Sequence, residues 1–295
     1  MIKKYHNTQL LPYILTCPTL LFVFFFILYP IFYTFKLSFQ NVNFLNPGVT
    51  QFVGFDTFKE VLFSPVTYTV LKNTLIWTGL STFLVIFLGI AVGHFLSQDF
   101  YIIKIVRALI LIPWVLPGVV IAGLWKWMYH SELGVINKIL TDLYILKTGK
   151  PWLGSPNTVL FAVIMVIVWR LAPLFSLVIS AAIQRIPYSI YEAGEIDGVN
   201  KWQKFFYLTL PQIKYPIYAI SLLVMIWGTN NLVLILLMTG GGPLHFSETL
   251  PVYLYKEGFM YYKASKAAAI AVINFFMLLA LSILYIKILV TPQKG

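Results

Sequence analysis

Residues 157–215 read NTVLFAVIMVIVWRLAPLFSLVISAAIQRIPYSIYEAGEIDGVNKWQKFFYLTLPQIKY and are the most informative segment for the fold. It begins with an apolar run, residues 157–183, that exceeds the roughly 20 residues an α-helix needs to cross a bilayer. A polar loop, residues 184–215, follows before the chain becomes apolar again. A long apolar segment, a short polar loop and a second apolar segment predict helices that cross a membrane.

The whole chain has the composition of an integral membrane protein. Its 295 residues are 59% hydrophobic and only 11% charged, whereas a soluble domain carries about 25% charged residues. Backbone groups in lipid must be hydrogen-bonded internally, so we expect an all-α protein. We expect one transmembrane domain, 1–295, with an N-terminal span, 11–35, and core spans within 70–289. The six predicted spans are 11–35, 70–96, 107–128, 157–183, 216–238 and 266–289.

Several classes of protein are excluded by the sequence. The net charge is +11, but the basic residues are scattered through loops and span ends, as in membrane proteins, so no nucleic-acid partner is expected. The single cysteine, Cys17, excludes an internal disulfide, and we expect it to be buried as a small apolar residue. The four histidines share no metal-ligand spacing, so no metal site is expected. A membrane-embedded hydrolase is also excluded, because the spans contain no nucleophile–base pair and no His-Glu-x-x-His motif.

Two spans carry residues that predict local geometry. Gly89 and Gly93 form a small-xxx-small pattern in the second span, which favours close helix packing. Pro113 and Pro117 lie in the third span. Each proline removes a backbone donor and crowds the carbonyl four residues earlier. The third span should therefore be kinked.

The polar loop predicts two short helices. Pro187 suits a first helical turn, and residues 188–196 have room for a helix that Gly198 can end in the left-handed conformation. Asn200 is the expected N-cap of a second helix, which should run to Phe205. We expect the prolines that follow to end this region before the next span.

The first loop helix has a surface suited to a partner protein. Ala193 and Gly194 form a patch of small residues, and Glu192 and Glu195 flank it and can pair with cations. The alternative is an amphipathic helix resting on the membrane surface. That alternative explains aromatic residues such as Trp202, but not the small patch between two acids. The residues alone leave both interpretations open.

The loop resembles the cytoplasmic signature loop of transmembrane permease subunits in binding-protein-dependent ATP-binding-cassette (ABC) importers. That signature is Glu-Ala-Ala, three residues, Gly, nine residues, a branched aliphatic residue, one residue and Leu-Pro. This chain differs only in a glycine for the third residue and a leucine for the usual isoleucine. The residues at the signature positions are Glu192, Ala193, Gly194, Gly198, Leu208, Leu210 and Pro211, and Asp197 with Gly198 matches the extended version of sugar permeases.

Other segments resemble the carbohydrate, maltose-permease-like branch of that family. They are FVGF at 52–55, GVIN at 134–137 and TGGGP at 239–243. The resemblance implies the type I ABC importer permease fold with a coupling-helix loop. It also implies a multi-pass protein of the cell membrane with both termini in the cytoplasm. Charge counting does not fix this orientation, because ten basic residues fall on each side.

The resemblance implies a transport subunit and not an enzyme. The chain has no Gly-x-x-x-x-Gly-Lys-Ser/Thr phosphate loop, so ATP and Mg are expected on partner chains and no cofactor on this one. The implied partners are two ABC ATPase subunits, a second homologous permease and an extracytoplasmic solute-binding protein, in contact with membrane lipid. The residues expected to couple the chain to the ATPase are Glu192, Ala193, Gly194, Asp197, Gly198, Leu208, Leu210 and Pro211.

Polar residues at membrane depth predict the substrate path. Arg170 lies near the middle of the fourth span, where a charge costs about 2.5–3.5 kcal/mol, so it should face a cavity or a partner. Pro173 frees the carbonyl of Trp169 from its helical bond, which predicts a broken helix. Amides can bond sugar hydroxyls, although these residues could instead join helices or bind the partner permease. The candidate substrate-binding residues are Trp169, Arg170, Trp227, Asn230, Asn231 and Asn274.

The function predicted on these grounds is import of a sugar or oligosaccharide by an ATP-driven, binding-protein-dependent importer. An anionic sugar derivative or glycerol phosphate is the alternative substrate that Arg170 raises. An ATP-independent membrane channel or carrier is the alternative from a different class. Such a protein has no need of a cytoplasmic loop built for an ATPase.

Overall fold

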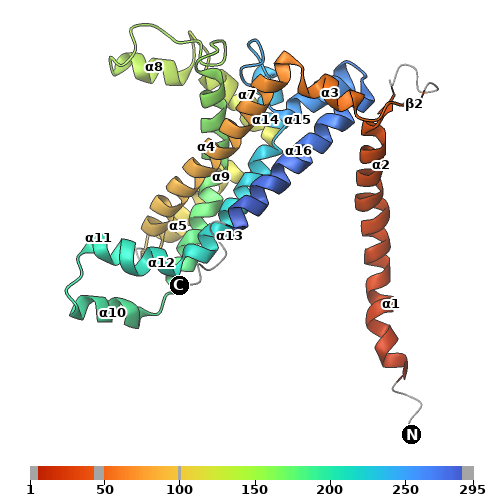
Figure 1. Cartoon of the computed structure of the whole chain (residues 1–295). Helices are drawn as coiled ribbons and strands as arrows, with labels where there is room; N and C mark the ends of the chain where they lie inside the picture. Colours follow the sequence, from red (N-terminus) through yellow and green to blue (C-terminus); the bar gives the residue numbers. More distant parts are fainter. Residues whose placement is uncertain (1–5, 43–49, 99–100, 288–295) are drawn as a thin grey trace. The chain divides into compact units, whose positions relative to one another are not determined.

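The computed structural model describes residues 6–42, 50–98 and 101–287, which are mainly helical (Figure 1). The first helices and the two strands are α1 His6–Val23, α2 Tyr29–Ser38, β1 Gln40–Asn41, β2 Gln51–Phe52, α3 Asp56–Leu62, α4 Pro65–Leu96, α5 Ile103–Leu109, α6 Ile112–Val115, α7 Gly118–Met128 and α8 Val135–Asp142. The later helices are α9 Val159–Gln184, α10 Tyr188–Ile196, α11 Lys201–Gln203, α12 Leu210–Gln212, α13 Lys214–Thr229, α14 Val233–Thr239, α15 Leu250–Tyr255 and α16 Ala264–Tyr285. Three π-helical turns, Phe24–Leu28, Lys204–Thr209 and Lys256–Met260, continue the helices that precede them.

The chain divides into two compact units. The smaller consists of Met1–Ser64 and Leu254–Phe275, and the larger of Pro65–Tyr253 and Phe276–Gly295. Helices α15 and α16 contribute residues to both units. The larger unit contains the loop and most of the candidate residues.

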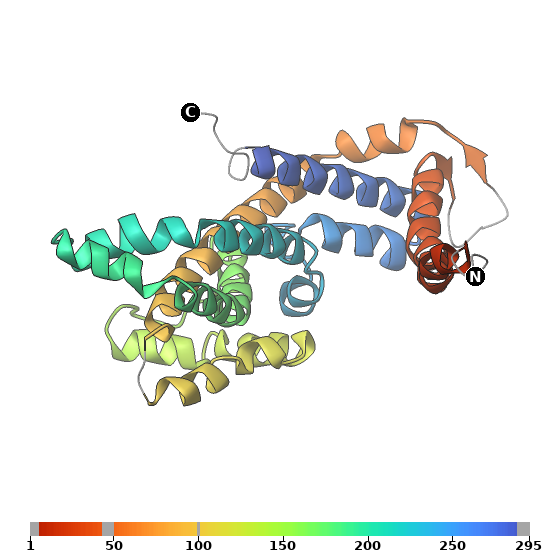
Figure 2. The ribbon, with the colours of Figure 1, turned by 90° about the horizontal axis from the view of Figure 1, so that it is seen from below.

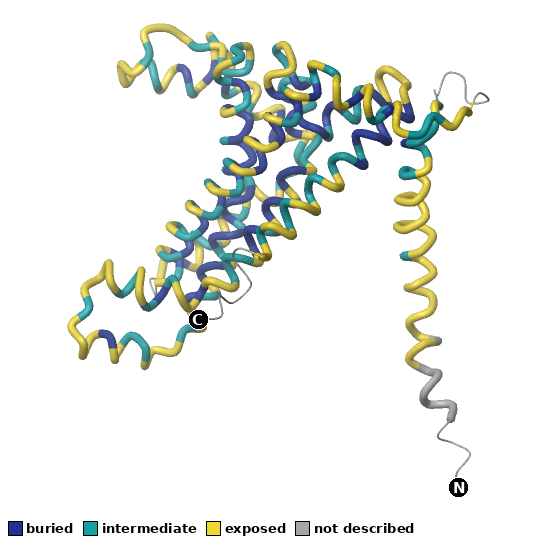
Figure 3. Tube along the Cα trace, in the orientation of Figure 1, coloured by how far each residue is buried: buried dark blue, intermediate teal, exposed yellow. Residues whose placement is uncertain are grey.

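Helix α9 is the buried centre of the larger unit. It packs against α4, α6, α13 and α14, and most of its residues are buried (Figure 3). A Cβ added to Gly93 of α4 would lie 2.7 Å from the Ser176 carbonyl oxygen, and one added to Gly89 would lie 3.6 Å from Phe175 Cβ. The prediction that these two glycines serve close helix packing is confirmed.

Four helices among the described residues are long and apolar enough to cross a membrane, and two bent helix pairs bring the possible total to six. The four are Leu15–Ser38, Pro65–Leu96, Val159–Gln184 and Ala264–Tyr285. These bounds lie within a few residues of the predicted spans, except that 288–289, the predicted end of the last span, lies outside the described residues. The structure therefore supports several membrane crossings.

The third predicted span is broken more sharply than a kink. Ile103–Val115 and Gly118–Met128 meet at 94°, because Leu116 and Pro117 have extended ψ angles of 136° and 140°. Pro117 has no backbone N–H to donate, so the helical hydrogen bonds are interrupted there. Leu116 directly precedes this proline, which disfavours the helical conformation at Leu116. The predicted irregularity is confirmed.

The prediction of one continuous span over 216–238 is wrong. Helix α13 ends at Thr229 and α14 begins at Val233. The Leu234 amide donates to Asn231 Oδ1 at 3.2 Å, so the asparagine side chain supplies an acceptor at the start of α14. Asparagine competes in this way with the helical backbone, which favours a new helix start.

The predicted break at Pro173 is also wrong. Helix α9 is continuous from Val159 to Gln184 with Pro173 buried inside it. A proline removes one hydrogen bond from a helix, and the helices packed around α9 hold the remaining turns in place. The broken helices of this unit are therefore the neighbours of α9 and not α9 itself.

In the smaller unit, α1 and α2 form one long apolar helix. In the most apolar part of Leu15–Ser38, no residue is buried against the rest of the described chain. Cys17 is exposed, so the expectation of a buried cysteine is wrong. Strands β1 and β2 pair antiparallel, with Gln40 opposite Phe52. Lys266 forms ion pairs with Glu257 at 3.1 Å and Glu60 at 3.5 Å.

The loop between α7 and α9 is organised by Asn137. Its side-chain amide donates to the carbonyl oxygens of His130 at 3.1 Å and Lys150 at 3.0 Å, and its oxygen accepts from Trp152 Nε1 at 2.8 Å. Asn137 is only 2% exposed. A Cβ added to Gly134 would lie 2.4 Å from the His130 carbonyl oxygen. The GVIN segment thus holds this loop in one conformation.

Candidate functional site

The predicted loop forms a pair of helices at one end of the larger unit. Helix α10 lies beside the continuous helical stretch of α11 and α12 (Figures 1 and 2). Helix α10 ends at Ile196, and Gly198, two residues later, has a φ of +73°. The Val199 amide donates to the Gly194 carbonyl at 3.0 Å, and the Gly198 amide to the Glu195 carbonyl at 3.1 Å. This pattern is a Schellman motif, so the predicted helix and its glycine stop are confirmed.

The second loop helix begins as predicted but ends later. Asn200 Oδ1 accepts from the Gln203 amide at 2.9 Å, and Gln203 Oε1 accepts from the Asn200 amide at 2.8 Å, which is a capping box. The helix continues beyond the predicted end at Phe205, through the π-helical turn to Gln212. Pro211 lies inside this continuous stretch, one residue before its end at Gln212.

Polar contacts join the two loop helices. Lys204 Nζ lies 2.8 Å from Glu195 Oε1 and 4.8 Å from the centre of the Tyr191 ring. The hydroxyls of Tyr191 and Thr209 are 3.1 Å apart. Both charged side chains are partly solvent-exposed, so the ion pair contributes at most about 1 kcal/mol. The apolar packing between the helices therefore decides their arrangement.

Gly194 and Leu208 form that apolar contact. A Cβ added to Gly194 would lie 2.6 Å from Leu208 Cδ1 and 3.0 Å from Val199 Cγ2. Gly194 is buried, whereas Ala193 is exposed. The expectation that both small residues form an open patch is therefore wrong for Gly194. Its missing side chain lets the second loop helix approach and does not present a surface to a partner.

The open face of α10 is a separate stripe. Ser189, Glu192, Ala193 and Ile196 are all exposed and have the i, i+3, i+4, i+7 spacing of one helix face. Ile196 is 86% exposed, and Glu192 forms no ion pair among the described residues. Ile196 was missed by the sequence reading, although this periodicity could have identified it. We call these four residues the α10 outer face.

A hollow of about 730 Å³ lies where the loop joins the membrane helices. It is lined by the ends of α4 and α9 and by both loop helices. The His94 and Phe205 rings, one from α4 and one from the loop, are 5.0 Å apart at its edge. The loop contacts α4 at this edge, and Ile186 and Leu210 also pack against the hydrophobic core of the larger unit.

A second site surrounds Arg170, within the membrane helices. A Cβ added to Gly118 would lie 3.5 Å from Arg170 Nη1 and 3.2 Å from Val233 Cγ1. Gly118 begins α7 and Val233 begins α14. Arg170 therefore lies beside the points where the two broken helices restart. Its Nε is buried without a hydrogen-bond partner in the described part of the chain.

Three candidate substrate-binding residues, Trp227, Asn230 and Asn231, lie at the end of α13 or between α13 and α14. Trp227 is exposed, and its ring lies 6.3 Å from that of Phe175. Asn230 is exposed and donates through Nδ2 to the Ile226 carbonyl at 3.0 Å. Asn231 caps α14, so its oxygen is already used. Of the two asparagines, Asn230 has the more accessible side chain.

The Trp169 ring does not lie at the Arg170 site. Consecutive helical residues point about 100° apart, and the Trp169 ring packs edge-on against Trp125 at 5.4 Å, on another side of α9 from Gly118. Asn274 belongs to the smaller unit. The six candidate residues are therefore divided among several surroundings in the fold.

An aromatic cavity of about 380 Å³ contains the Trp169 ring together with Trp125, Tyr129 and Trp152. The Tyr129 hydroxyl donates to the Ala162 carbonyl at 3.1 Å. Burial raises the pKa of Tyr129 to about 12, so this hydroxyl remains a donor at neutral pH. Trp125 Nε1 is buried without a partner among the described residues. No group of three or more His, Cys, Asp or Glu in the described ranges could hold a metal ion.

A protein-family model agrees with these features. The model described as "Binding-protein-dependent transport system inner membrane component" matches residues 85–292. The match includes the loop, both broken helices and Arg170.

Curated relatives and a solved structure extend the similarity to nearly the whole chain. The diacetylchitobiose uptake system permease protein DasB of Streptomyces coelicolor is 31% identical over 97% of this chain and 88% of its own length. The sulfoquinovosyl glycerol transport system permease protein SmoG of Agrobacterium fabrum is 28% identical over 97% of this chain and 92% of its own length. A chain in the crystal structure of a bacterial ABC transporter involved in the import of the acidic polysaccharide alginate has a TM-score of 0.81 and 23% identity, over 95% of this chain and 94% of that one. This last similarity establishes a common fold.

Proposed function

The chain belongs to the family of inner membrane components of binding-protein-dependent transport systems, and we propose that it forms half of the membrane path of a sugar or oligosaccharide importer. It is an ABC transporter permease, a transport subunit and not an enzyme. The two relatives described above are named for uptake of diacetylchitobiose and of sulfoquinovosyl glycerol. Both compounds are sugar derivatives, which supports a carbohydrate substrate for this chain.

The proposed topology has six crossings in one membrane domain, 1–295. The bent pair Ile103–Val115 and Gly118–Met128 counts as one crossing, and α13 with α14 counts as another, in addition to the four long helices. An even number of crossings leaves both termini on one side, which we take as the cytoplasm. The loop of α10 to α12 then lies in the cytoplasm, and the Asn137 loop lies on the outer face, at the other end of α9 (Figure 1).

The proposed contact with the ATPase is the α10 outer face. The chain contains no phosphate loop, so two partner ABC ATPase subunits would bind ATP and Mg. Ile196 supplies an exposed apolar side chain and Glu192 an uncompensated charge, which together suit a groove with apolar and basic residues. The Gly194–Leu208 contact and the Lys204–Glu195 ion pair make the two helices one body that can transmit movement to α13.

The proposed substrate path passes Arg170. This proposal is based on one observation: Arg170 lies beside Gly118 and Val233, the first residues of α7 and α14. Helix starts present unpaired amides, and guanidinium donors can bond sugar hydroxyls. Asn230 and Trp227, at the end of α13, add an amide and an indole. A second homologous permease would complete the path, and an extracytoplasmic binding protein would deliver the sugar.

Reconstitution tests this function. The chain, its companion permease and the ATPase are incorporated into liposomes, with the binding protein on the outer side, and uptake of a labelled oligosaccharide is measured. Uptake should require ATP on the loop side and the binding protein on the other. Equal uptake without ATP, or by a chain lacking 188–212, would establish a channel or carrier instead.

An anionic sugar derivative is a second candidate substrate. Arg170 forms no ion pair with Asp or Glu among the described residues, so a carboxylate, sulfonate or phosphate could compensate its charge. Competition between a uronic-acid oligosaccharide and a neutral one of equal length distinguishes the two candidates. Preference for the charged competitor that disappears in Arg170→Gln would favour the anion.

A further inference from the structure

The hollow where the loop joins the membrane helices is polar and positively charged. Lys201 and Lys204 of the loop line it, together with Gln98 and Gln184 near the ends of α4 and α9. No Asp or Glu occurs among its lining residues in the described part of the chain. Its volume of about 730 Å³ lies within the range of about 300–1,000 Å³ that is typical of small-molecule sites. The hollow therefore has the size and the charge of a site for a small anion.

Lys201 provides the uncompensated charge of the hollow. It is exposed and forms no ion pair within the described ranges. Lys204 Nζ lies 2.8 Å from Glu195 Oε1, so these two charges balance. An ammonium group has three donors, however, and Lys204 can still donate to a ligand. Two ammonium groups that line one hollow, with a single carboxylate partner between them, favour an anionic ligand.

Hydroxyl groups line the same hollow. Those of Tyr191 and Thr209 are 3.1 Å apart, and Ser97 Oγ donates to the His94 carbonyl at 2.7 Å. A hydroxyl oxygen has two lone pairs, so it can accept a hydrogen bond from a ligand while it donates within the chain. The Gln184 amide can both donate and accept. This lining suits a molecule that carries hydroxyl groups as well as an anion.

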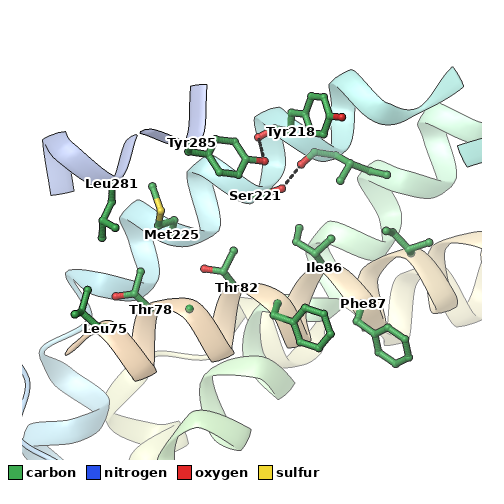
Figure 4. Close-up of a pocket in the computed structure, with 14 residues that line it drawn as sticks. Leu75, Thr78, Thr82, Ile86, Phe87, Tyr218, Ser221, Met225, Leu281 and Tyr285 are labelled. Carbon is green, nitrogen blue, oxygen red and sulfur yellow. Dashed lines mark hydrogen bonds between the residues drawn. The ribbon is translucent and has the colours of Figure 1, made fainter. Parts of the chain in front are cut away.

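The apolar groove between α4, α13 and α16 has a different character (Figure 4). Its volume is about 500 Å³, and no charged residue of the described ranges lines it. Ile86, Met225 and Leu281 are among the apolar side chains at its walls (Figure 4). The Tyr285 hydroxyl at this groove already donates to the Tyr218 carbonyl at 3.2 Å. The cationic lining therefore distinguishes the hollow at the loop from this groove of the same unit.

We propose that the hollow at the loop binds a phosphate ester that also carries hydroxyl groups. The phosphate group lies next to Lys201 and Lys204, and the hydroxyl groups lie toward Ser97 and Gln184. Hydrogen bonds from an ammonium group to phosphate oxygens are about twice as strong as neutral ones, so the phosphate end fixes the ligand. Two sources have this chemistry: a soluble sugar phosphate and the phosphoglycerol headgroup of a membrane lipid.

The site goes beyond the proposed transport function, because its residues are separate from those of the path past Arg170. Its lining comes from the loop and from the ends of α4 and α9, so a bound ester would connect them. We expect the ester to hold the loop in one position and to slow ATP-driven uptake. Only this effect on uptake rests on the proposed function, whereas the binding itself does not.

Native mass spectrometry of the full chain in mild detergent tests the site. The chain is titrated separately with glucose 6-phosphate, with glucose and with dioleoyl phosphatidylglycerol. At least one of the two phosphate esters should form an adduct of one ligand per chain, and glucose should form none at the same concentration. Lys201→Gln should weaken this adduct about tenfold, which is the effect of one charge-assisted hydrogen bond. The ester whose adduct depends on Lys201 identifies the source.

Matched controls distinguish the hollow from the general charge of the chain. Lys214→Gln removes an exposed lysine whose Nζ lies 5.1 Å from the centre of the Tyr215 ring, outside the hollow, and should leave the adduct unchanged. Gln184→Glu adds a negative charge to the lining at almost constant size and should weaken the adduct. Gln212→Glu adds the same charge to an exposed residue of α12 outside the hollow and should have no effect.

Three results would overturn the proposal: no adduct of either ester, a glucose adduct as tight as that of glucose 6-phosphate, or an ester adduct that Lys201→Gln leaves unchanged. These measurements need neither the ATPase nor transport, so their outcome is independent of the reconstitution. In the reconstituted importer, the ester that binds should lower uptake severalfold when it is supplied on the loop side, but not with the Lys201→Gln chain. Unchanged uptake with the ester bound would refute its effect on the loop.

Discussion

Gly194 and Leu208 pack directly against each other across the two helices of the loop. A Cβ added to Gly194 would lie 2.6 Å from Leu208 Cδ1. Gly194, which stands where the signature has alanine, and the aliphatic Leu208 thus have a structural role. They set the distance between the helix that offers an outer face and the helix that leads into the membrane.

A double substitution tests this contact. Gly194→Ala should separate the loop helices and lower ATP-dependent uptake severalfold, because overpacking costs about 1–3 kcal/mol. Leu208→Ala in the same chain makes room for the added methyl group and should restore at least part of the uptake. Uptake by the double variant no better than by Gly194→Ala alone would contradict the packing role.

The outer face of α10 should be needed for assembly with the ATPase. Glu192→Lys reverses the one charge of this face and should reduce co-purification of the ATPase at least tenfold and uptake in proportion. Glu195→Gln is the control, since Glu195 pairs with Lys204 within the loop and a partly exposed pair contributes at most about 1 kcal/mol. If Glu192→Lys assembles and transports normally, the proposed contact is refuted.

Ile196 should contribute to the same contact through apolar burial. Ile196→Ser removes most of an exposed side chain without touching the Schellman motif. Burial of such a side chain is worth about 1.5–3 kcal/mol, so the affinity for the ATPase should fall about tenfold or more. The thermal unfolding temperature of the isolated chain should not change, because the residue has few contacts within it. A lower unfolding temperature with unchanged ATPase affinity would place Ile196 in the chain's own packing.

Asn137 should be essential for the loop between α7 and α9. Asn137→Ala removes the buried amide that bonds His130, Lys150 and Trp152. Each buried group left unpaired costs about 1–3 kcal/mol, so the unfolding temperature should fall by several degrees. Lys138→Ala is the control, because Lys138 forms only an exposed pair with Asp142. An equal effect of the two variants would show that the Asn137 network adds little stability.

Arg170 should act on transport rather than on folding. Arg170→Gln should lower uptake at least tenfold, while expression in the membrane and ATPase co-purification remain. Asn230→Ala should lower uptake less, and Asn231→Ala should also destabilise the chain, because Asn231 caps α14. Normal uptake by Arg170→Gln would remove this residue from the proposed path.

Much of the local structure could be predicted from the sequence. The apolar runs located the four long membrane helices to within a few residues, because hydrophobic length and internal hydrogen bonding leave few alternatives in lipid. Helix α10 was predicted at its correct bounds, because Gly198 and Asn200 are strong local signals. The break near Pro117 followed from its missing amide.

Other features depended on what packs around each residue. The sequence alone determined that this is a helical membrane chain with a capped polar loop, since composition, proline and capping chemistry act over a few residues. Only the tertiary structure decided that Pro173 leaves α9 intact, that Gly194 faces Leu208, and that Arg170 meets the starts of α7 and α14. Those outcomes depend on contacts between distant segments, which local patterns do not encode.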